Sequence, residues 1–225
     1  MPLGGVPAGM SYRPSDAFED RTEAGHRLGE ALAGRDIGAD LVLAIPRGGL
    51  PVGRAVADAL GLPLDVAVAS KIGAPGNPEL AIGAVASDGS VWIDEEAVDA
   101  LGVDREYVER ERERESRAAR EKADRYRTDE PPTVSGRTVI VVDDGAATGS
   151  TAIAAVRLLR ARGADRIVVA LPVAPPETVE ELERVADEVV SLLTPASFGA
   201  VGRFYRRFDQ VSDEEAIAYL REGDG

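Results

Sequence analysis

The chain has 225 residues, a length that fits one large α/β domain or two small ones. It contains no cysteine, which excludes disulfides and thiolate nucleophiles, and its single histidine excludes histidine metal clusters and serine–histidine–aspartate triads. The net charge of −14 argues against a nucleic-acid-binding surface, because such surfaces need clustered positive charge. What remains is chemistry by carboxylates, hydroxyls, backbone amides and arginines, with any metal ion held by oxygen.

The cationic residues are almost all arginines, because only Lys71 and Lys122 are lysines among the 26. An acidic, lysine-poor composition is typical of proteins from salt-loaded cytoplasms, so we expect a halophilic protein. A GC-rich genome, which also favours arginine, alanine, glycine and aspartate, is the alternative. The first residues lack the basic and apolar regions of a signal peptide, and no long uncharged apolar run occurs. We therefore expect a cytoplasmic protein that binds neither membranes nor nucleic acid.

The first half of the chain predicts helices and strands in alternation, followed by a hairpin. An arm rich in proline and glycine (1–17) precedes a helix at 18–34, a buried strand at 40–46, a helix from the RGGLPVG turn to Ala59, and a strand at 63–70. A loop rich in glycine and proline follows at 71–79, then a hairpin of strands 79–86 and 91–94, and a charged helix at 95–127.

The second half resumes the alternation after a breaker at 131–136. Strands are predicted at 138–144, 166–173 and 188–194, separated by helices at 149–162 and 176–186. An aromatic-rich loop at 197–208 then leads to a last helix at 212–222, where Ser212 and Glu215 have the spacing of a capping box.

This order of elements predicts an α/β fold, with a Rossmann-like parallel sheet flanked by helices. Residues 71–130 look like an insertion into the sheet domain, made of a flexible loop, a hairpin and the charged helix. Opposite charges three residues apart, such as Glu109–Arg112 and Glu111–Arg114, support that helix. We interpret its charges as a solvated face; a binding surface is the alternative.

Three segments place unusual residues after predicted strands, at the edge where parallel sheets bind ligands. They are Pro46-Arg47-Gly48-Gly49, Ser70-Lys71, and the run Asp143-Asp144-Gly145-Ala146-Ala147-Thr148-Gly149-Ser150-Thr151. The third joins a strand to a helix through small and hydroxylated residues. It would leave free backbone N–H groups at the positive end of a helix dipole, which favours a bound anion.

The two aspartates before this loop change the kind of ligand that it predicts. Asp143 and Asp144 would repel a phosphate in direct contact, but they suit hydrogen bonds from vicinal hydroxyls one sugar length away. The segment therefore predicts a grip for a sugar phosphate, with hydroxyls on the carboxylates and a terminal phosphate on the amides. An ordinary strand-to-helix turn, with one aspartate as the helix cap, is the alternative.

At this point the chain resembles the type I phosphoribosyltransferases. The segment VIVVDDGAATGST (139–151) matches that family's signature for 5-phosphoribosyl-1-pyrophosphate (PRPP). The resemblance covers roughly 18–194, which we take as the core, and leaves 195–225 as a C-terminal tail. It implies that Arg47, Gly48, Gly49 and Lys71 meet the pyrophosphate, and that residues 143–151 bind the ribose and its 5′-phosphate. It also implies a flexible catalytic loop at 72–90.

The resemblance implies transfer of the phosphoribosyl group from PRPP to a nitrogenous base, with release of pyrophosphate. Arg47, Lys71, Asp143 and Asp144 are the implied catalytic residues. Mg²⁺ is the implied cofactor, held mainly by the diphosphate and the ribose hydroxyls and not by a protein ligand cluster. The implied partners are small molecules, with a homodimer as a candidate assembly. A non-catalytic regulator that binds PRPP or a nucleotide is the alternative function.

The acceptor base is not named by the sequence. Relatives that act on 6-oxopurines usually carry an acidic residue where this chain has Ala147, which predicts poor use of hypoxanthine and guanine. Tyr205 and Phe208 could stack on a base or pack the tail with equal ease. Asn77 and Glu79 could act from the flexible loop, although an Asn-Pro turn explains Asn77 equally well.

Overall fold

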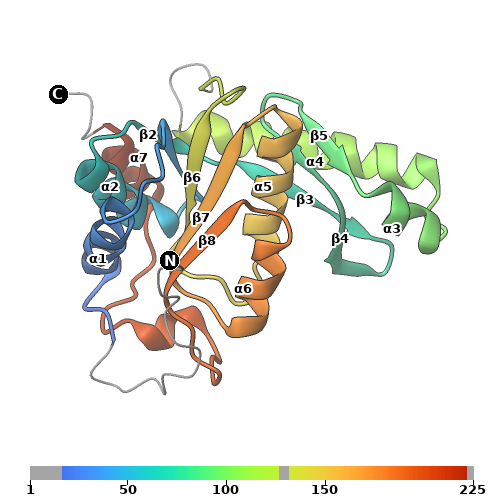
Figure 1. The fold of residues 1–225 in the computed structure, drawn as a ribbon. Coiled ribbons are helices and arrows are strands. Elements are labelled where there is room, and N and C mark those ends of the chain that lie inside the picture. The colour runs from blue at the N-terminus through green and yellow to red at the C-terminus, as the bar shows by residue number, and fades with distance from the viewer. Residues whose placement is uncertain (1–16, 127–131, 222–225) are drawn as a thin grey trace.

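The computed structural model describes residues 17–126 and 132–221. Its centre is a sheet of five parallel strands in the order β2-β1-β6-β7-β8 (Figure 1). These strands are β1 (Leu41–Ala44), β2 (Leu64–Val66), β6 (Thr138–Val142), β7 (Arg166–Val173) and β8 (Glu188–Leu193). The predicted α/β architecture is therefore confirmed, and the predicted arm at 1–17 lies almost entirely outside the described residues.

Helices cover both faces of this sheet, with α1 and α2 on one face and α5 and α6 on the other (Figure 1). The helices are α1 (Arg21–Ala33), α2 (Gly49–Leu60), α3 (Glu95–Ala100), α4 (Arg105–Tyr126), α5 (Ser150–Ala161), α6 (Pro176–Glu183) and α7 (Asp213–Arg221), with a 3₁₀ helix η2 at Val201–Phe204.

The central strands are apolar throughout because both of their faces are buried. In β6, Val139 and Val141 pack towards α5, whereas Ile140 and Val142 pack towards α1 and α2. The four alternate between two separate core clusters, and each is completely buried. A continuous apolar run in the sequence therefore corresponds to a strand between two helical layers.

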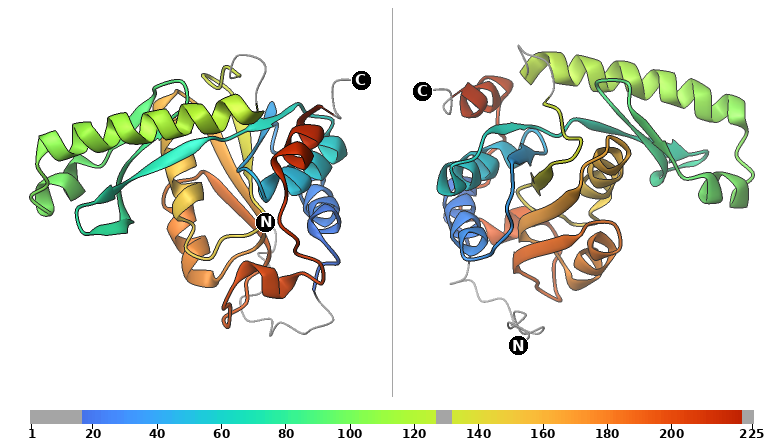
Figure 2. Two further views of the ribbon diagram at one scale, coloured as in Figure 1. Left: turned by 180° about the vertical axis from the view of Figure 1, so that it is seen from behind. Right: turned by 45° about the horizontal axis from the view of Figure 1, so that its top comes forward.

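A second sheet forms an arm that projects from one side of the core (Figures 1 and 2). It consists of antiparallel β3 (Ala69–Ala74), β4 (Asn77–Ala86) and β5 (Val91–Ile93), and α3 and α4 accompany it. The prediction of a loop at 71–79 is wrong, because β3 and β4 fill all of that range except a short turn. The glycines and prolines that suggested a loop fit a turn and an irregular register instead; Gly76 has φ +75° and the pairing shifts around Gly73.

Two other predicted elements are divided in the structure. The predicted strand 63–70 splits into β2 and β3, which belong to different sheets, so its continuous pattern hides a change of partner. The predicted helix 95–127 splits into α3 and α4 around Gly102, whose φ of +61° ends a helix. Charge alternation cannot reveal such a break. In a smaller correction, α6 ends at Glu183 instead of residue 186.

The described part of the C-terminal segment packs against the rest of the domain. Phe18 and Tyr205 form a parallel bridge, and Phe204 is buried. Helix α7 lies beside the C-terminal end of α4 (Figure 2), and Ala216 of α7 belongs to the same core cluster as Ala119 and Ala123 of α4. The capping box is confirmed: the Ser212 backbone N–H donates to Glu215 and the Glu215 N–H donates to the Ser212 hydroxyl, at 2.8 and 3.1 Å.

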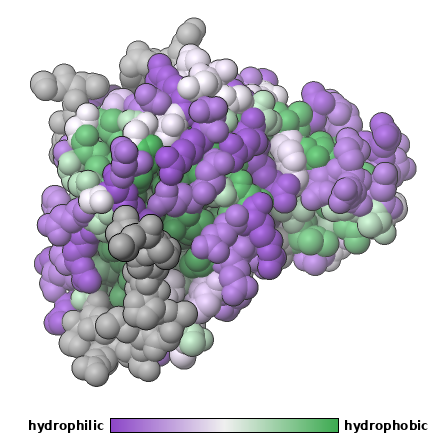
Figure 3. Space-filling view, viewed as in Figure 1, coloured by the Kyte–Doolittle hydropathy of each residue, from purple (hydrophilic) through white to green (hydrophobic). Residues whose placement is uncertain are grey.

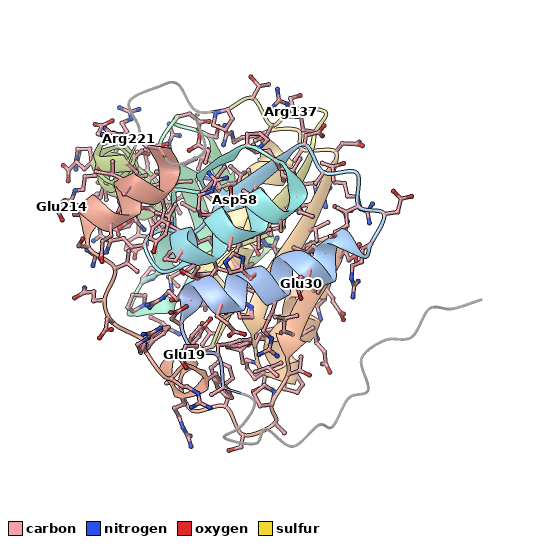
Figure 4. The ribbon with its side chains drawn as sticks, turned by 90° about the vertical axis from the view of Figure 1, so that its left-hand side faces the viewer. Glu19, Glu30, Asp58, Arg137, Glu214 and Arg221 are labelled. Carbon is pink, nitrogen blue, oxygen red and sulfur yellow. The ribbon has the colours of Figure 1, made fainter. Side chains whose placement is uncertain are left out.

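The surface is strongly charged. Hydrophilic residues cover much of the face in Figure 3, and on the arm the apolar Leu80 and Leu101 also reach solvent. Figure 4 shows the side of α1, α2 and α7, where the side chains of Glu30, Asp58 and Glu214 point outward. No helix within 17–126 or 132–221 combines the length and the apolar character that crossing a bilayer needs.

Candidate functional site

The loops after β1 and β6 lie against each other at the carboxyl edge of the sheet. A Cβ atom added to Gly48 would overlap the Asp144 carboxylate. One added to Gly49 would lie 2.8 Å from the Val142 carbonyl oxygen and 3.0 Å from Asp143 Cα. Only glycine permits this approach. The structure thus brings the predicted Pro46-Arg47-Gly48-Gly49 loop, which has a cis peptide bond between Pro46 and Arg47, to the acidic pair.

The two carboxylates of the acidic pair are half-buried neighbours. Asp143 Oδ1 accepts a hydrogen bond of 2.8 Å from the Asp144 backbone N–H. Burial raises the pKa of Asp143 well above its usual value, and the adjacent Asp144 charge raises it further. Burial also raises the pKa of Asp144, although a nearby arginine opposes this. Such a pair favours ligands that donate hydrogen bonds or carry positive charge.

That arginine is Arg21, which the sequence analysis did not single out. Arg21 Nε lies 2.7 Å from Asp144 Oδ2, and both side chains are largely buried. Its Nη1 donates to the Asp209 carbonyl oxygen at 2.7 Å, and its guanidinium lies 3.8 Å from the Phe208 ring centroid. Arg21 therefore links the acidic pair to the C-terminal segment. No local pattern could have found it, because the two partners are 123 residues apart.

Tyr205, from the C-terminal segment, also contacts Asp144. Its hydroxyl donates to the Asp144 carbonyl oxygen at 2.5 Å, and burial raises the pKa of this phenol. The ring packs between Phe18 and Phe208, with centroid distances of 5.3 and 5.0 Å. Of the two roles left open for Tyr205, packing is the one the structure shows. The Phe208 ring lies between Tyr205 and Arg21, so it is engaged as well.

The loop from Gly145 to Gly149 leads into α5 in the manner that an anion cradle requires. Gly145 and Gly149 have φ of +151° and +67°, values that side chains rarely permit. Gly149 is the N-cap and makes no side-chain cap, so neither aspartate serves as the helix cap. Thr148 and Thr151 are exposed, and Thr148 lies 3.3 Å from the Ser150 hydroxyl. The first amides of α5 thus point to an accessible surface with hydroxyls around it.

Two hydrogen bonds with neighbouring elements hold the loop from Gly145 to Gly149 in place. The buried Thr178 of α6 donates its hydroxyl to the Ala147 carbonyl oxygen at 2.7 Å. The Ala146 N–H donates to the Val173 carbonyl at 3.0 Å. The loop conformation is therefore fixed by neighbouring elements before any ligand binds, which lowers the cost of ordering it.

Arg47 is held by the C-terminal helix. Its Nη1 lies 3.4 Å from Asp213 Oδ1, the oxygen that also accepts a 3.0 Å hydrogen bond from the Tyr126 hydroxyl. Asp213 begins α7 and Tyr126 ends α4. The last turn of α4 and the first turn of α7 thus stand beside the β1–α2 loop, and the sequence did not indicate this meeting.

Lys71 lies on the arm. It belongs to β3 and pairs with Ala84 of β4, which packs against Ala154 and Leu158 of α5. Because directly paired residues share one face of a sheet, Lys71 is on the face turned towards α5. Arg157 of α5 stacks on Trp92 of β5 at 4.2 Å and fastens that face to the core. Lys71 therefore lies on the second sheet, and not on the loops after β1 and β6 that carry the other predicted site residues.

A family model supplies the decisive comparison: the model of the phosphoribosyl transferase domain matches residues 21–205. The chain belongs to this family. The match extends past residue 194, where the sequence analysis ended the core, and it includes the segment that carries Tyr205.

Relatives of this phosphoribosyl transferase domain agree. A Mycobacterium tuberculosis protein named as a candidate phosphoribosyl transferase is 43% identical over 205 residues, 90% of this chain and 46% of that protein. The chain thus spans about half the length of this curated relative. A uracil phosphoribosyltransferase of Streptomyces griseus is 45% identical over 74 residues, 32% of this chain and 35% of that enzyme. The crystal structure of TT1426 from Thermus thermophilus matches with a TM-score of 0.87 and 45% identity, covering 93% of this chain and 100% of that one.

Proposed function

We propose that the protein transfers the 5-phosphoribosyl group of PRPP to a nitrogenous base. In this reaction the bond between ribose C1 and the pyrophosphate oxygen breaks, a bond from C1 to a base nitrogen forms, and that nitrogen loses its proton. The observation that carries the proposal is the acidic pair set between an amide cradle and the Arg47 loop. This arrangement offers separate places for ribose hydroxyls, a 5′-phosphate and a diphosphate.

The residues would act by position and charge. Asp143 and Asp144 would accept hydrogen bonds from the ribose hydroxyls and stabilise the positive charge that develops on the ring in an oxocarbenium-like transition state. The amides and hydroxyls from Gly145 to Thr151 would hold the 5′-phosphate, so that C1 is fixed relative to the base. Arg47 and Lys71 would stabilise the departing pyrophosphate.

Mg²⁺ fits this donor set as a substrate-bound ion. Within the two described ranges, His, Cys, Asp and Glu form no group of three that could hold a metal by itself. The carboxylates of Asp143 and Asp144 are hard oxygen donors beside the expected ribose hydroxyls, which suits an ion held mainly by substrate oxygens. When bound, Mg²⁺ would neutralise charge on the diphosphate.

The test is binding followed by turnover. The double variant Asp143→Asn/Asp144→Asn should bind PRPP about ten-fold more weakly or worse, because hydrogen bonds to charged groups contribute about 1.5–3 kcal/mol each. Glu30→Gln/Glu214→Gln is the matched control, since it also removes two charges but from outward-pointing side chains (Figure 4). Calorimetry that gives equal PRPP affinity for the two double variants would reject the sugar-phosphate assignment.

Turnover decides between the enzyme and a non-catalytic regulator that binds PRPP or a nucleotide. Membership of the transferase family supports the enzyme. Release of pyrophosphate from PRPP and Mg²⁺ should depend on an added base, and uracil belongs in the set because uracil phosphoribosyltransferases match part of the chain. Tight PRPP binding without pyrophosphate release with any base would favour the regulator.

A further inference from the structure

The charged helix α4 carries a half-buried lysine close to its C-terminal end. Ala119, Ala123 and Tyr126 on its last two turns are buried in a cluster with Ala44 of β1 and other apolar residues of the sheet edge. Lys122 is three residues after Ala119 and four before Tyr126, so it lies on the same inward stripe. Its side chain is half-buried, whereas Arg117 and Arg120 on the same helix are exposed.

The position of this stripe is fixed by the contacts of Tyr126. Its hydroxyl and Arg47 both meet Asp213 Oδ1, at 3.0 and 3.4 Å, which sets the last turn of α4 beside the β1–α2 loop. Lys122, one turn earlier on this stripe, lies near enough to Asp143 and Arg47 for both charges to act on it. Burial lowers the pKa of Lys122, Asp143 opposes this shift, and Arg47 adds to it.

Like charges meet in this cluster. Lys122 and Arg47 are both cations in a partly desolvated place, where the charge of Asp143 acts on Lys122 and Asp213 lies 3.4 Å from Arg47. When Asp143 accepts ribose hydroxyls, it neutralises Lys122 less, and the two cations stand on the side of the acidic pair where α4 and α7 meet the β1–α2 loop. A polyanion there would relieve their repulsion and gain two charge-assisted interactions.

We propose that Lys122 binds the pyrophosphate group of PRPP, together with Arg47, from the inner face of α4. The proposal rests on the proposed function and adds a residue to its site. It gives α4 a role in ligand binding: the helix closes the pyrophosphate side of the site, while Arg117 and Arg120 stay in solvent.

The first experiment measures binding of pyrophosphate with Mg²⁺ by calorimetry. Lys122→Met keeps the aliphatic stem and should weaken this binding by about ten-fold or more, while Lys122→Arg should restore most of it. Ribose 5-phosphate should bind the Lys122→Met variant as it binds the wild type, because its phosphate occupies the cradle. Arg117→Ala, an exposed cation removed from the same helix, should change neither affinity.

A second measurement avoids substitutions and folding defects altogether. The chain has two lysines, so amine acetylation followed by mass spectrometry reports Lys71 and Lys122 separately. Pyrophosphate with Mg²⁺ should slow acetylation of Lys122 several-fold, and ribose 5-phosphate should not.

The outcomes separate this inference from the proposed function. Unchanged Lys122 acetylation with protection of Lys71, or equal loss of pyrophosphate and ribose 5-phosphate binding in Lys122→Met, would overturn the role of Lys122 and leave the transferase intact. A wild-type protein that binds neither PRPP nor pyrophosphate would overturn both.

Discussion

Replacing Arg21 tests whether contacts from segments distant in sequence stabilise the acidic pair of Asp143 and Asp144. The Arg21→Ala variant loses the 2.7 Å ion pair with Asp144 and the contact of the guanidinium with the Phe208 ring. A hydrogen bond between charged groups contributes about 1.5–3 kcal/mol, and a cation–π contact about 1 kcal/mol. We expect the free energy of unfolding to fall by about 3 kcal/mol, which for a chain of this size lowers the melting temperature by about 6–12 °C.

Arg27→Ala is the matched control on the same helix. Arg27 also lies over an aromatic ring, that of Phe18 at 4.8 Å, but its ion pair with Glu23 is exposed and 3.6 Å long. Exposed pairs contribute about 0–1 kcal/mol. Thermal unfolding in a double-mutant cycle with Asp144→Asn should return a coupling energy of about 1.5–3 kcal/mol for Arg21.

The loss caused by Arg21→Ala should also depend on pH. Arg21 opposes the raised pKa of Asp144, so its removal raises the folded-state pKa further. A carboxyl whose folded-state pKa is raised favours the folded state at low pH and loses that contribution as pH rises through the raised value. Destabilisation should therefore be greater near pH 8 than near pH 5.5. A loss that is equal at both values, additive with Asp144→Asn and no larger than that of Arg27→Ala would refute this account of the acidic pair.

Three further predictions concern the acceptor base, the effect of salt on the charged surface, and the ion pair between Arg47 and Asp213. Ala147 is exposed in the cradle loop and stands where relatives that act on 6-oxopurines usually carry an acidic residue, so steady-state rates should favour adenine or a non-standard base; a clear preference for hypoxanthine or guanine would contradict this. The net charge of −14 should make the melting temperature rise from dilute buffer to about 1 M potassium chloride, where the screening length is about 3 Å; a flat or falling curve would leave genomic bias as the explanation. Asp213→Asn should free Arg47 and tighten pyrophosphate binding by up to about five-fold, the equivalent of about 1 kcal/mol; weaker binding would instead show that Asp213 positions Arg47.

Local patterns in the sequence were sufficient for the parallel core. Strands such as β6 and β7 are buried on both faces, so they form continuous apolar runs that can be recognised without knowing their partners. The segment 143–151 could be recognised in the same way, because its acidic pair, small residues and hydroxyls, which we propose bind one ligand, are contiguous in the chain. The capping box at Ser212 is local for the same reason.

What only the tertiary structure decided are the contacts between segments distant in sequence. The hydrophobic pattern reports that a residue is buried but not against what, so it could not show that the run at 63–70 divides between two sheets. Arg21 and Tyr205 contact Asp144, and Lys122 comes within the influence of the Asp143 charge, because α1, α4 and the C-terminal segment pack around the sheet. A single charge on a helix has the same local pattern whether it meets water or a buried carboxylate, and only the packing of that helix distinguishes the two.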